Sequence, residues 1–353
     1  MKTEGEQRML DDLNIIQQRD PKNALAVASS EVSQLQFEAS VKNATAINKD
    51  IKTIVVAGMG GSALAAGMAK SWLQLNIPFE IVKNYDLPQY VNEKTLVIAS
   101  SYSGNTEETL EALSQAKNKN AQIAIIAAGG KLVEIANEGD YPLATLPASM
   151  QPRMAVHYNL RGLVYLLEKY SIIEGKYDEI ASTHDWLKEE VSRWAPETPE
   201  QDNLAKQLAM KAMGKTPVIY AGSVMAPIAY KWKISFNENS KNVAFWNELP
   251  EFNHNEFIGW SSHPIEKPFA VFDLVSGFEN HRTLRRFAIS DQLLSGQRPK
   301  AITIELAGQS VIEQMLWGGV LADFVSIYLA ILNGVDPTPV VLIEKLKEKL
   351  NSV

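Results

Sequence analysis

The feature that most constrains the fold is a short β-branched run that ends in a cluster of glycines. Residues 53–57 read Thr-Ile-Val-Val-Ala, and Gly58-Met59-Gly60-Gly61-Ser62 follows at once. An alanine-rich stretch with helical periodicity then continues to Leu73. This order predicts a strand, a tight loop and a helix, which together form the repeating unit of a parallel α/β sheet.

The same alternation recurs along the chain. Further strands are expected at residues 79–82, 95–100 and 122–127, with a helix at 106–116. Another strand, loop and helix begins at residues 216–223, where Gly222 can be laid over Gly58 as in a degenerate internal repeat. The pattern predicts an α/β protein with two doubly wound domains, whose parallel sheets are flanked by helices and bind ligands at the carboxyl ends of the strands.

Length and composition fit two domains. The chain has 353 residues, of which 46% are hydrophobic and 21% are charged, as in ordinary globular proteins. We expect a helical N-terminal segment, a first domain that binds phosphate, a helical connection and a second domain that carries catalytic residues, over residues 1–50, 51–162, 163–207 and 208–353.

Several classes of protein are disfavoured. The net charge of -7 and the lack of a basic block argue against nucleic acid as a partner. Because the chain has no cysteine, disulfides, thiolate zinc sites and cysteine nucleophiles are impossible. Residues 1–20 lack the apolar core of a signal peptide, so we expect a cytoplasmic protein. Asp323 interrupts the long apolar stretch at residues 315–335, which favours a buried helix over a membrane-spanning one, so no membrane is expected as a partner.

The glycine loop is a candidate anion site. Backbone N–H groups at a helix N-terminus attract anions, although a tight packing turn explains the glycines about as well. A dinucleotide site would need an acidic residue after the next strand, where Lys83 and Asn84 stand. A second element, Ser101-Tyr102-Ser103-Gly104-Asn105-Thr106, places several hydroxyls before another helix. Capping by Asn105 or Thr106 would explain only part of this pattern.

These two elements resemble the phosphate-binding segments of sugar isomerase (SIS) domains. That superfamily includes phosphoglucose isomerases, the isomerase half of glucosamine-6-phosphate synthase and sugar-sensing transcription regulators. The resemblance implies phosphosugar binding by Gly60, Gly61, Ser62, Ser101, Ser103 and Thr106. It does not by itself imply catalysis.

Candidate acid/base residues lie in the second half. An aldose–ketose isomerase needs a carboxylate that moves a proton between C1 and C2, and a group that opens the sugar ring. Glu238, within Asn237-Glu238-Asn239-Ser240-Lys241, and His254, within residues 249–256, supply these types. From the residues alone, a solvated carboxylate at a helix end is the favoured interpretation of Glu238, and a structural role in a loop explains His254 equally well.

These segments, together with residues 334–340, resemble the bifunctional phosphoglucose/phosphomannose isomerases over nearly the whole chain. The resemblance implies that Glu238 is the proton-transfer base and His254 the ring-opening residue. It further implies that Lys345 assists ring opening and that Arg153 stabilises the enediolate. Thr338 would leave room for both C2 epimers, glucose 6-phosphate and mannose 6-phosphate, on the way to fructose 6-phosphate.

The expected reaction needs neither metal nor nucleotide cofactor. The five histidines (His157, His184, His254, His263 and His281) show no metal-ligand spacing. Arg282, Arg285 and Arg286 form a basic group on an expected helix, where a solvated face is favoured over a substrate contact.

Three other functions are compatible with parts of this pattern. A non-catalytic phosphosugar sensor would usually carry a helix-turn-helix domain, for which residues 1–51 offer no room. A glutamine-dependent amidotransferase needs an N-terminal cysteine to release ammonia from glutamine, and the absence of cysteine excludes that function. An isomerase or epimerase of a related phosphosugar stays open. The working unit is expected to be a homodimer with a shared active site, because the resemblance implies that the ring-opening histidine reaches the pocket of the neighbouring subunit.

Overall fold

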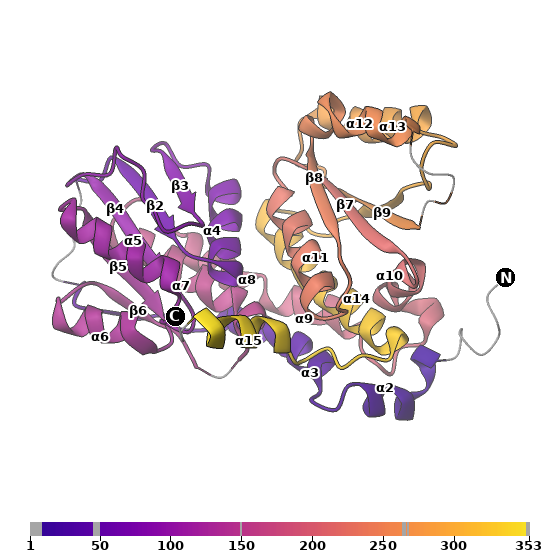
Figure 1. The fold of residues 1–353 in the computed structure, drawn as a ribbon, viewed down its shortest axis with the longest axis horizontal. Helices are drawn as coiled ribbons and strands as arrows, with labels where there is room; N and C mark the ends of the chain where they lie inside the picture. Colours follow the sequence, from indigo (N-terminus) through magenta and orange to yellow (C-terminus); the bar gives the residue numbers. More distant parts are fainter. Residues whose placement is uncertain (1–8, 45–49, 149, 263–265, 267, 351–353) are drawn as a thin grey trace. The chain divides into compact units, whose positions relative to one another are not determined.

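The computed structural model describes residues 9–44, 50–148, 150–262, 266 and 268–350, which form two compact units (Figure 1). The N-terminal unit is Ser30–Leu187, and the C-terminal unit joins Met1–Ser29 to Lys188–Val353. Each is an α/β unit with a mainly parallel sheet, which confirms the predicted fold class. The chain passes between the units within α3 (Ala24–Ser30) and α9 (His184–Ser192).

The two units divide the chain at points other than the domain boundaries expected from the sequence. Residues 163–169 continue α7 (Val156–Lys169), which packs against α4 (Gly60–Leu73) inside the N-terminal unit. The N-terminal helices before Ser30 belong to the C-terminal unit. There, Arg19 Nη1 donates to the Ile331 carbonyl over 2.7 Å.

The N-terminal unit is built on a sheet with the strand order β1-β6-β5-β4-β2-β3, in which only β1 runs antiparallel to its neighbour among the described strands. Its strands are β1 (Val41–Lys42), β2 (Thr53–Ala57), β3 (Phe79–Val82), β4 (Thr95–Ser100), β5 (Gln122–Ala127) and β6 (Leu143–Thr145). Besides α4 and α7, its helices are η2 (Glu31–Gln36), α5 (Glu107–Asn118), α6 (Gly130–Glu138), η4 (Pro152–Met154) and α8 (Lys176–Ser182).

The central strands are apolar on both faces. Every residue of β4 is buried, and β2 and β5 are buried apart from their first residues. Such continuous burial is typical of parallel strands covered by helices on both sides. The sequence-predicted strands at residues 53–57, 79–82, 95–100 and 122–127 are confirmed with the same bounds.

The C-terminal unit has a wholly parallel described sheet with the order β10-β9-β7-β8. The strands are β7 (Thr216–Gly222), β8 (Phe245–Leu249), β9 (Phe269–Val275) and β10 (Ile302–Glu305). The helices of its second half are α11 (Ala226–Glu238), η6 (Glu251–His254), α12 (Glu256–Gly259), η7 (Trp260–Ser262), α13 (His281–Leu293), α14 (Val311–Asn333) and α15 (Val341–Leu350). They are preceded by η1 (Met9–Asp11), α2 (Leu13–Arg19), η5 (Glu200–Asp202) and α10 (Leu204–Ala212).

Helix α14 is the core helix of the C-terminal unit. It packs against α10 and α11, and its described residues from Gln314 to Leu332 are buried. Within the described part of the chain, it is the one helix whose length and composition would let it cross a membrane. The most apolar stretch of this helix is 100% buried within the protein, as we expect from the sequence for a buried helix.

Candidate active site

The two predicted phosphate elements lie at the same edge of the N-terminal sheet. β2 and β4 are parallel neighbours, with Thr53 opposite Thr95, so the loops after Ala57 and Ser100 leave the sheet together. The chain continues from β2 to β3 on one side and from β4 to β5 on the other. The two loops therefore flank the point at which the strand order reverses, where doubly wound sheets bind their ligands.

Close backbone contacts explain two of the glycines. A Cβ on Gly58 would lie 2.7 Å from the Ser100 carbonyl oxygen. Gly104 has φ +71°, and a Cβ there would lie 1.7 Å from the Gly129 carbonyl oxygen. Only glycine allows the loops after β2, β4 and β5 to pack this tightly.

Three of the predicted phosphate ligands meet in one hydroxyl cluster. Ser101 Oγ lies 2.7 Å from Thr106 Oγ1 and 3.4 Å from Ser103 Oγ. Thr106 is the N-cap residue of α5, yet its side chain makes no capping hydrogen bond. Its hydroxyl instead joins the cluster at the N-terminal end of α5, where the backbone N–H groups favour an anion.

In the glycine loop after β2, mainly backbone groups rather than side chains face a possible ligand. Ser62 is buried, and its Oγ lies within hydrogen-bonding distance of Asn159 Oδ1, at 3.2 Å. Because this carbonyl oxygen only accepts, the Ser62 hydroxyl proton is donated to α7. Gly60 and Gly61 begin α4, and the N–H groups of a first helical turn have no acceptor within the helix. In this loop, the glycine N–H groups rather than the Ser62 hydroxyl are therefore the donors available to a ligand.

Arg153 lies next to the glycine loop. A Cβ on Gly61 would be 2.7 Å from the carbonyl oxygen of Pro152, the first residue of η4. Arg153 follows directly and is 7% exposed. The structure thus places this guanidinium-bearing segment against the predicted phosphate cradle, within the same unit.

The corresponding loop of the C-terminal unit is already filled by a carboxylate. A Cβ on Gly222 would lie 2.2 Å from Glu279 Cδ, and Glu279 Oε1 accepts from the Met225 N–H over 3.0 Å at the start of α11. Burial raises the pKa of the Glu279 carboxyl, and hydrogen bonds from the Met225 and Val224 N–H groups oppose that rise. The sequence does not predict Glu279 at this position, because no local pattern relates it to Gly222.

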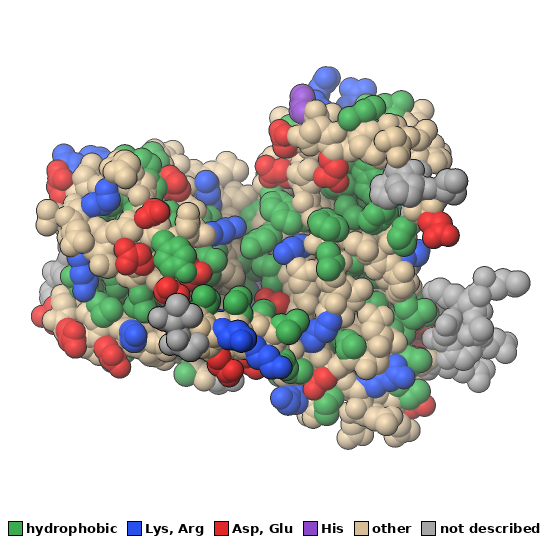
Figure 2. Space-filling view, in the orientation of Figure 1, with side chains coloured by type: hydrophobic (Ala, Val, Ile, Leu, Met, Phe, Trp, Pro, Cys, Tyr) green, Lys and Arg blue, Asp and Glu red, His purple; other side chains and the backbone are tan. Residues whose placement is uncertain are grey.

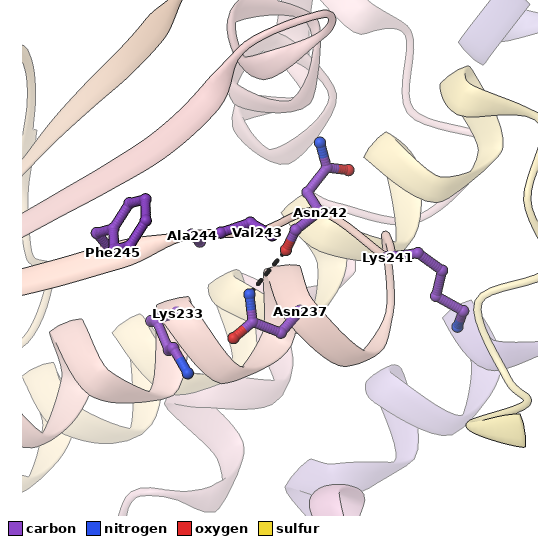
Figure 3. A pocket seen from close by; sticks show the side chains of 7 residues that line it. All are labelled: Lys233, Asn237, Lys241, Asn242, Val243, Ala244 and Phe245. Atoms are coloured by element: carbon purple, nitrogen blue, oxygen red, sulfur yellow. Dashed lines mark hydrogen bonds between the residues drawn. The ribbon is translucent and has the colours of Figure 1, made fainter. Parts of the chain in front are cut away.

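Glu238 is the last residue of α11 and is half-buried. Hydrogen bonds to α14 and within the turn itself hold the residues that follow Glu238 in place. Asn239 Nδ2 donates to Ser326 Oγ over 2.9 Å, and Asn237 Nδ2 donates to the Asn242 carbonyl over 2.7 Å (Figure 3). Lys233, Asn237 and the residues from Lys241 to Phe245 line an open cavity of about 370 Å³ beside this turn.

The other predicted residues of the C-terminal unit lie on separate elements. His254 is exposed at the end of η6, a short helix where a polar loop was expected. Thr338 follows α14, and its N–H donates to Asp336 Oδ1 over 2.8 Å. Lys345 is exposed on α15, whose surface carries lysines beside apolar side chains (Figure 2).

Glu238 and His254 of one chain lie at opposite ends of a strand. β8 runs parallel to β7, and α11 returns from the carboxyl end of β7 to the amino end of β8. Glu238 therefore stands before β8 and His254 after it. Five strand residues span about 16 Å, so the structure does not bring these two side chains together within one unit.

A basic pocket borders the segment of His254. Arg282, Arg285 and Arg286 line a cavity of about 350 Å³ with Asn253, and Arg286 Nη1 donates to Asn253 Oδ1 over 3.2 Å. Basic side chains and a histidine are visible at the surface over α12 and α13 (Figure 2). The sequence identified the three arginines but not their link to the residue before His254.

The described residues contain no group of three or more His, Asp or Glu side chains arranged to hold a metal. Of the five histidines, His263 lies outside the described residues. His157 is buried, with Nδ1 3.3 Å from the Glu31 carbonyl oxygen, and His184 Nδ1 lies 2.7 Å from Asp185 Oδ1. Both rings have local protein partners.

Comparison with solved structures supports the fold. The C-terminal domain of glucosamine-fructose-6-phosphate aminotransferase from Francisella tularensis matches with a TM-score of 0.65 at 16% identity, over 92% of this chain and 97% of that one. A glucose-6-phosphate isomerase like protein from Thermus thermophilus matches with a TM-score of 0.65 at 18% identity, over 97% and 99%. At these identities the likeness shows the fold alone.

Sequence comparison shows the family. Residues 49–157 match the SIS domain, and residues 201–350 match the bacterial phospho-glucose isomerase C-terminal SIS domain. The D-glucosamine-6-phosphate 4-epimerase of Sulfolobus acidocaldarius is 34% identical over 62% of this chain and 69% of its own length.

Two relatives match over most of their length. The bifunctional phosphoglucose/phosphomannose isomerase of Caldicellulosiruptor bescii is 40% identical over 86% of this chain and 91% of that protein. The protein of the same name from Aquifex aeolicus is 35% identical over 90% and 95%. This chain therefore belongs to the family of bifunctional phosphoglucose/phosphomannose isomerases.

Proposed function

We propose that this protein is a cytoplasmic aldose–ketose isomerase that interconverts glucose 6-phosphate or mannose 6-phosphate with fructose 6-phosphate. The observation that carries the proposal is the hydroxyl cluster of Ser101, Ser103 and Thr106. It lies at a helix N-terminus beside the point where the strand order reverses, in a member of this isomerase family. A phosphate dianion would accept hydrogen bonds from these hydroxyls and from the backbone of Gly60 and Gly61.

The proposed chemistry moves one proton between C2 and C1 of the sugar and one between the oxygens that those carbons carry. His254, assisted by Lys345, opens the ring by protonating the ring oxygen while the anomeric hydroxyl loses its proton. The Glu238 carboxylate then removes the proton from C2 of the aldose and returns it to C1, while the hydroxyl proton on O2 passes to O1, so the overall composition of the sugar is unchanged. The Arg153 guanidinium stabilises the negative charge of the enediolate intermediate. No cofactor takes part in these steps.

Thr338 would set the tolerance for the sugar's configuration. Glucose 6-phosphate and mannose 6-phosphate differ only at C2, so a single base serves both only if the open-chain sugar can rotate into a second pose. Thr338 is a small residue held in a turn by Asp336, and we propose that it leaves space for this rotation.

We further propose that the enzyme works as a homodimer whose subunits share the active sites. The support is the position of Glu238 and His254 at opposite ends of β8 in one chain. A neighbouring subunit could supply the histidine that the chain's own strand holds away from Glu238.

A second candidate is action on a related phosphosugar. The match to a D-glucosamine-6-phosphate 4-epimerase favours it, because a protein that is 34% identical over 62% of this chain bears that name. Such an enzyme would use the same phosphate cradle but change the configuration at a different carbon.

Turnover assays on the purified protein distinguish the two candidates. Glucose 6-phosphate and mannose 6-phosphate should each give fructose 6-phosphate, and reaction in deuterated water should place deuterium at C1 or C2. A product changed at C4, with no exchange at C1 or C2, would replace the isomerase with an epimerase.

A further inference from the structure

Lys241 fastens the turn after Glu238 to the segment that carries Thr338. Its Nζ donates to the carbonyl oxygen of Glu238 over 2.6 Å, to that of Asn239 over 3.2 Å and to that of Pro337 over 3.0 Å. The first two carbonyls belong to the end of α11, where the helix dipole favours a cation. The third carbonyl belongs to the residue just before Thr338.

The backbone of Lys241 is in an unfavourable conformation. Its φ is +58°, a left-handed value that favours glycine and that few other L-residues adopt without strain. Because glycine or asparagine would fit this backbone better, the lysine at this position is explained by its side chain. Residues held in such conformations gather at functional sites.

The turn has separate anchors in the rest of the unit. Asn239 Nδ2 reaches the buried Asp323 on α14, and Asn333 Nδ2 donates to Asn242 Oδ1 over 2.9 Å. These bonds hold the turn to α14, whereas Lys241 points away from Lys233 and Asn237 and reaches the C-terminal segment (Figure 3). The bond to Pro337 therefore adds a link between the two places where Glu238 and Thr338 stand.

We propose that Lys241 is a positioning residue for the isomerase reaction, which holds the Glu238 carboxylate and the Thr338 turn in fixed relation through their backbone carbonyls. This inference rests on the proposed function, since it assigns Lys241 a role in placing the proposed base against the sugar. Removing the ammonium releases the three carbonyls and removes this link between the base and the Thr338 turn. Small displacements of a reacting group are costly, up to about a hundredfold for 1 Å.

Lys241→Gly separates positioning from folding. Glycine relieves the strain of the left-handed backbone, which offsets the lost hydrogen bonds, so the melting temperature should change little, while kcat on both aldoses should fall by roughly tenfold or more. KM should change less than kcat, because the predicted phosphate ligands are elsewhere. The ratio of glucose 6-phosphate to mannose 6-phosphate turnover should also change. Lys241→Arg, which keeps a cation and donors, should recover part of the lost kcat.

Lys233→Met is the matched control, since Lys233 lines the same cavity and has no assigned part in the reaction. This variant should have the same kcat and the same ratio of glucose 6-phosphate to mannose 6-phosphate turnover as the unaltered protein. An unaltered kcat and ratio in Lys241→Gly would overturn the inference, as would a fall in kcat accompanied by an equal loss of folded protein. If the unaltered protein turns over neither aldose, the proposed function fails, and that result does not depend on Lys241.

Discussion

Lys231 Nζ lies 2.6 Å from Asp323 Oδ2 in the core of the C-terminal unit, where the two side chains are 4% and 0% exposed. Ser235 Oγ also donates to Asp323 Oδ1, over 2.9 Å. The ion pair joins α11, which ends at the proposed base, to the buried helix α14. Removing one partner of such a pair leaves a buried charge without compensation.

We expect Lys231→Met and Asp323→Leu each to lower the free energy of unfolding by about 3–5 kcal/mol. The double substitution should lose less than the sum of the two, because neither charge then remains buried. Urea unfolding of all three variants gives the coupling energy directly. Strictly additive losses would show that the pair contributes nothing as a pair.

The hydroxyl cluster gives a prediction about phosphate binding. Ser103→Ala and Thr106→Ala each remove a hydroxyl that could donate to a dianion, and a hydrogen bond to a charged group contributes about 1.5–3 kcal/mol. Calorimetric titration with fructose 6-phosphate should therefore show weaker binding for each variant. Ser182→Ala, at an exposed serine of α8, serves as the control. Unchanged binding in the Ser103→Ala/Thr106→Ala protein would place the phosphate elsewhere.

Glu279 predicts a hidden anion site in the C-terminal unit. Its carboxylate occupies the position at the start of α11 that corresponds to the cradle of the N-terminal unit. Glu279→Ala exposes the Met225 and Val224 N–H groups, so inorganic phosphate should raise the melting temperature of this variant more than that of the unaltered protein. Glu279→Gln fills the same space and should behave like the unaltered protein. An equal response of all three proteins to phosphate would contradict the hidden site.

The local pattern predicted the described strands β2, β3, β4, β5 and β7, but it missed β1, β6, β8, β9 and β10 and the long-range contacts. The bounds of β2, β4 and β5 follow from apolar, partly β-branched runs that are followed by short loops containing glycine or serine, so they could be predicted from neighbouring residues. The hydroxyl cluster was also foreseeable, because Ser101 and Thr106 lie on one loop. These features depend on short separations along the chain.

The contacts that fill or hold the site join residues far apart in sequence. Glu279 follows Gly222 by 57 positions, and Lys241 precedes its acceptor Pro337 by 96. No periodicity or motif records such pairs, because they arise only when the sheet has brought distant loops together. The positive φ of Lys241 is likewise a property of the folded turn.

The arrangement of Glu238 and His254 leads to the last prediction. Since β8 separates them in one chain, Glu238→Gln and His254→Ala should each lower isomerisation by roughly a hundredfold or more. If the histidine acts in the neighbouring subunit, mixing the two inactive proteins under subunit exchange restores one pocket in which both residues are intact. With random exchange of equal amounts, about half the dimers are hybrids with one good pocket of two, so activity should recover to about a quarter of the unaltered level. Isotope-labelled subunits can verify exchange by native mass spectrometry. Exchange without recovery, or an active monomer, would mean that Glu238 and His254 serve the same chain.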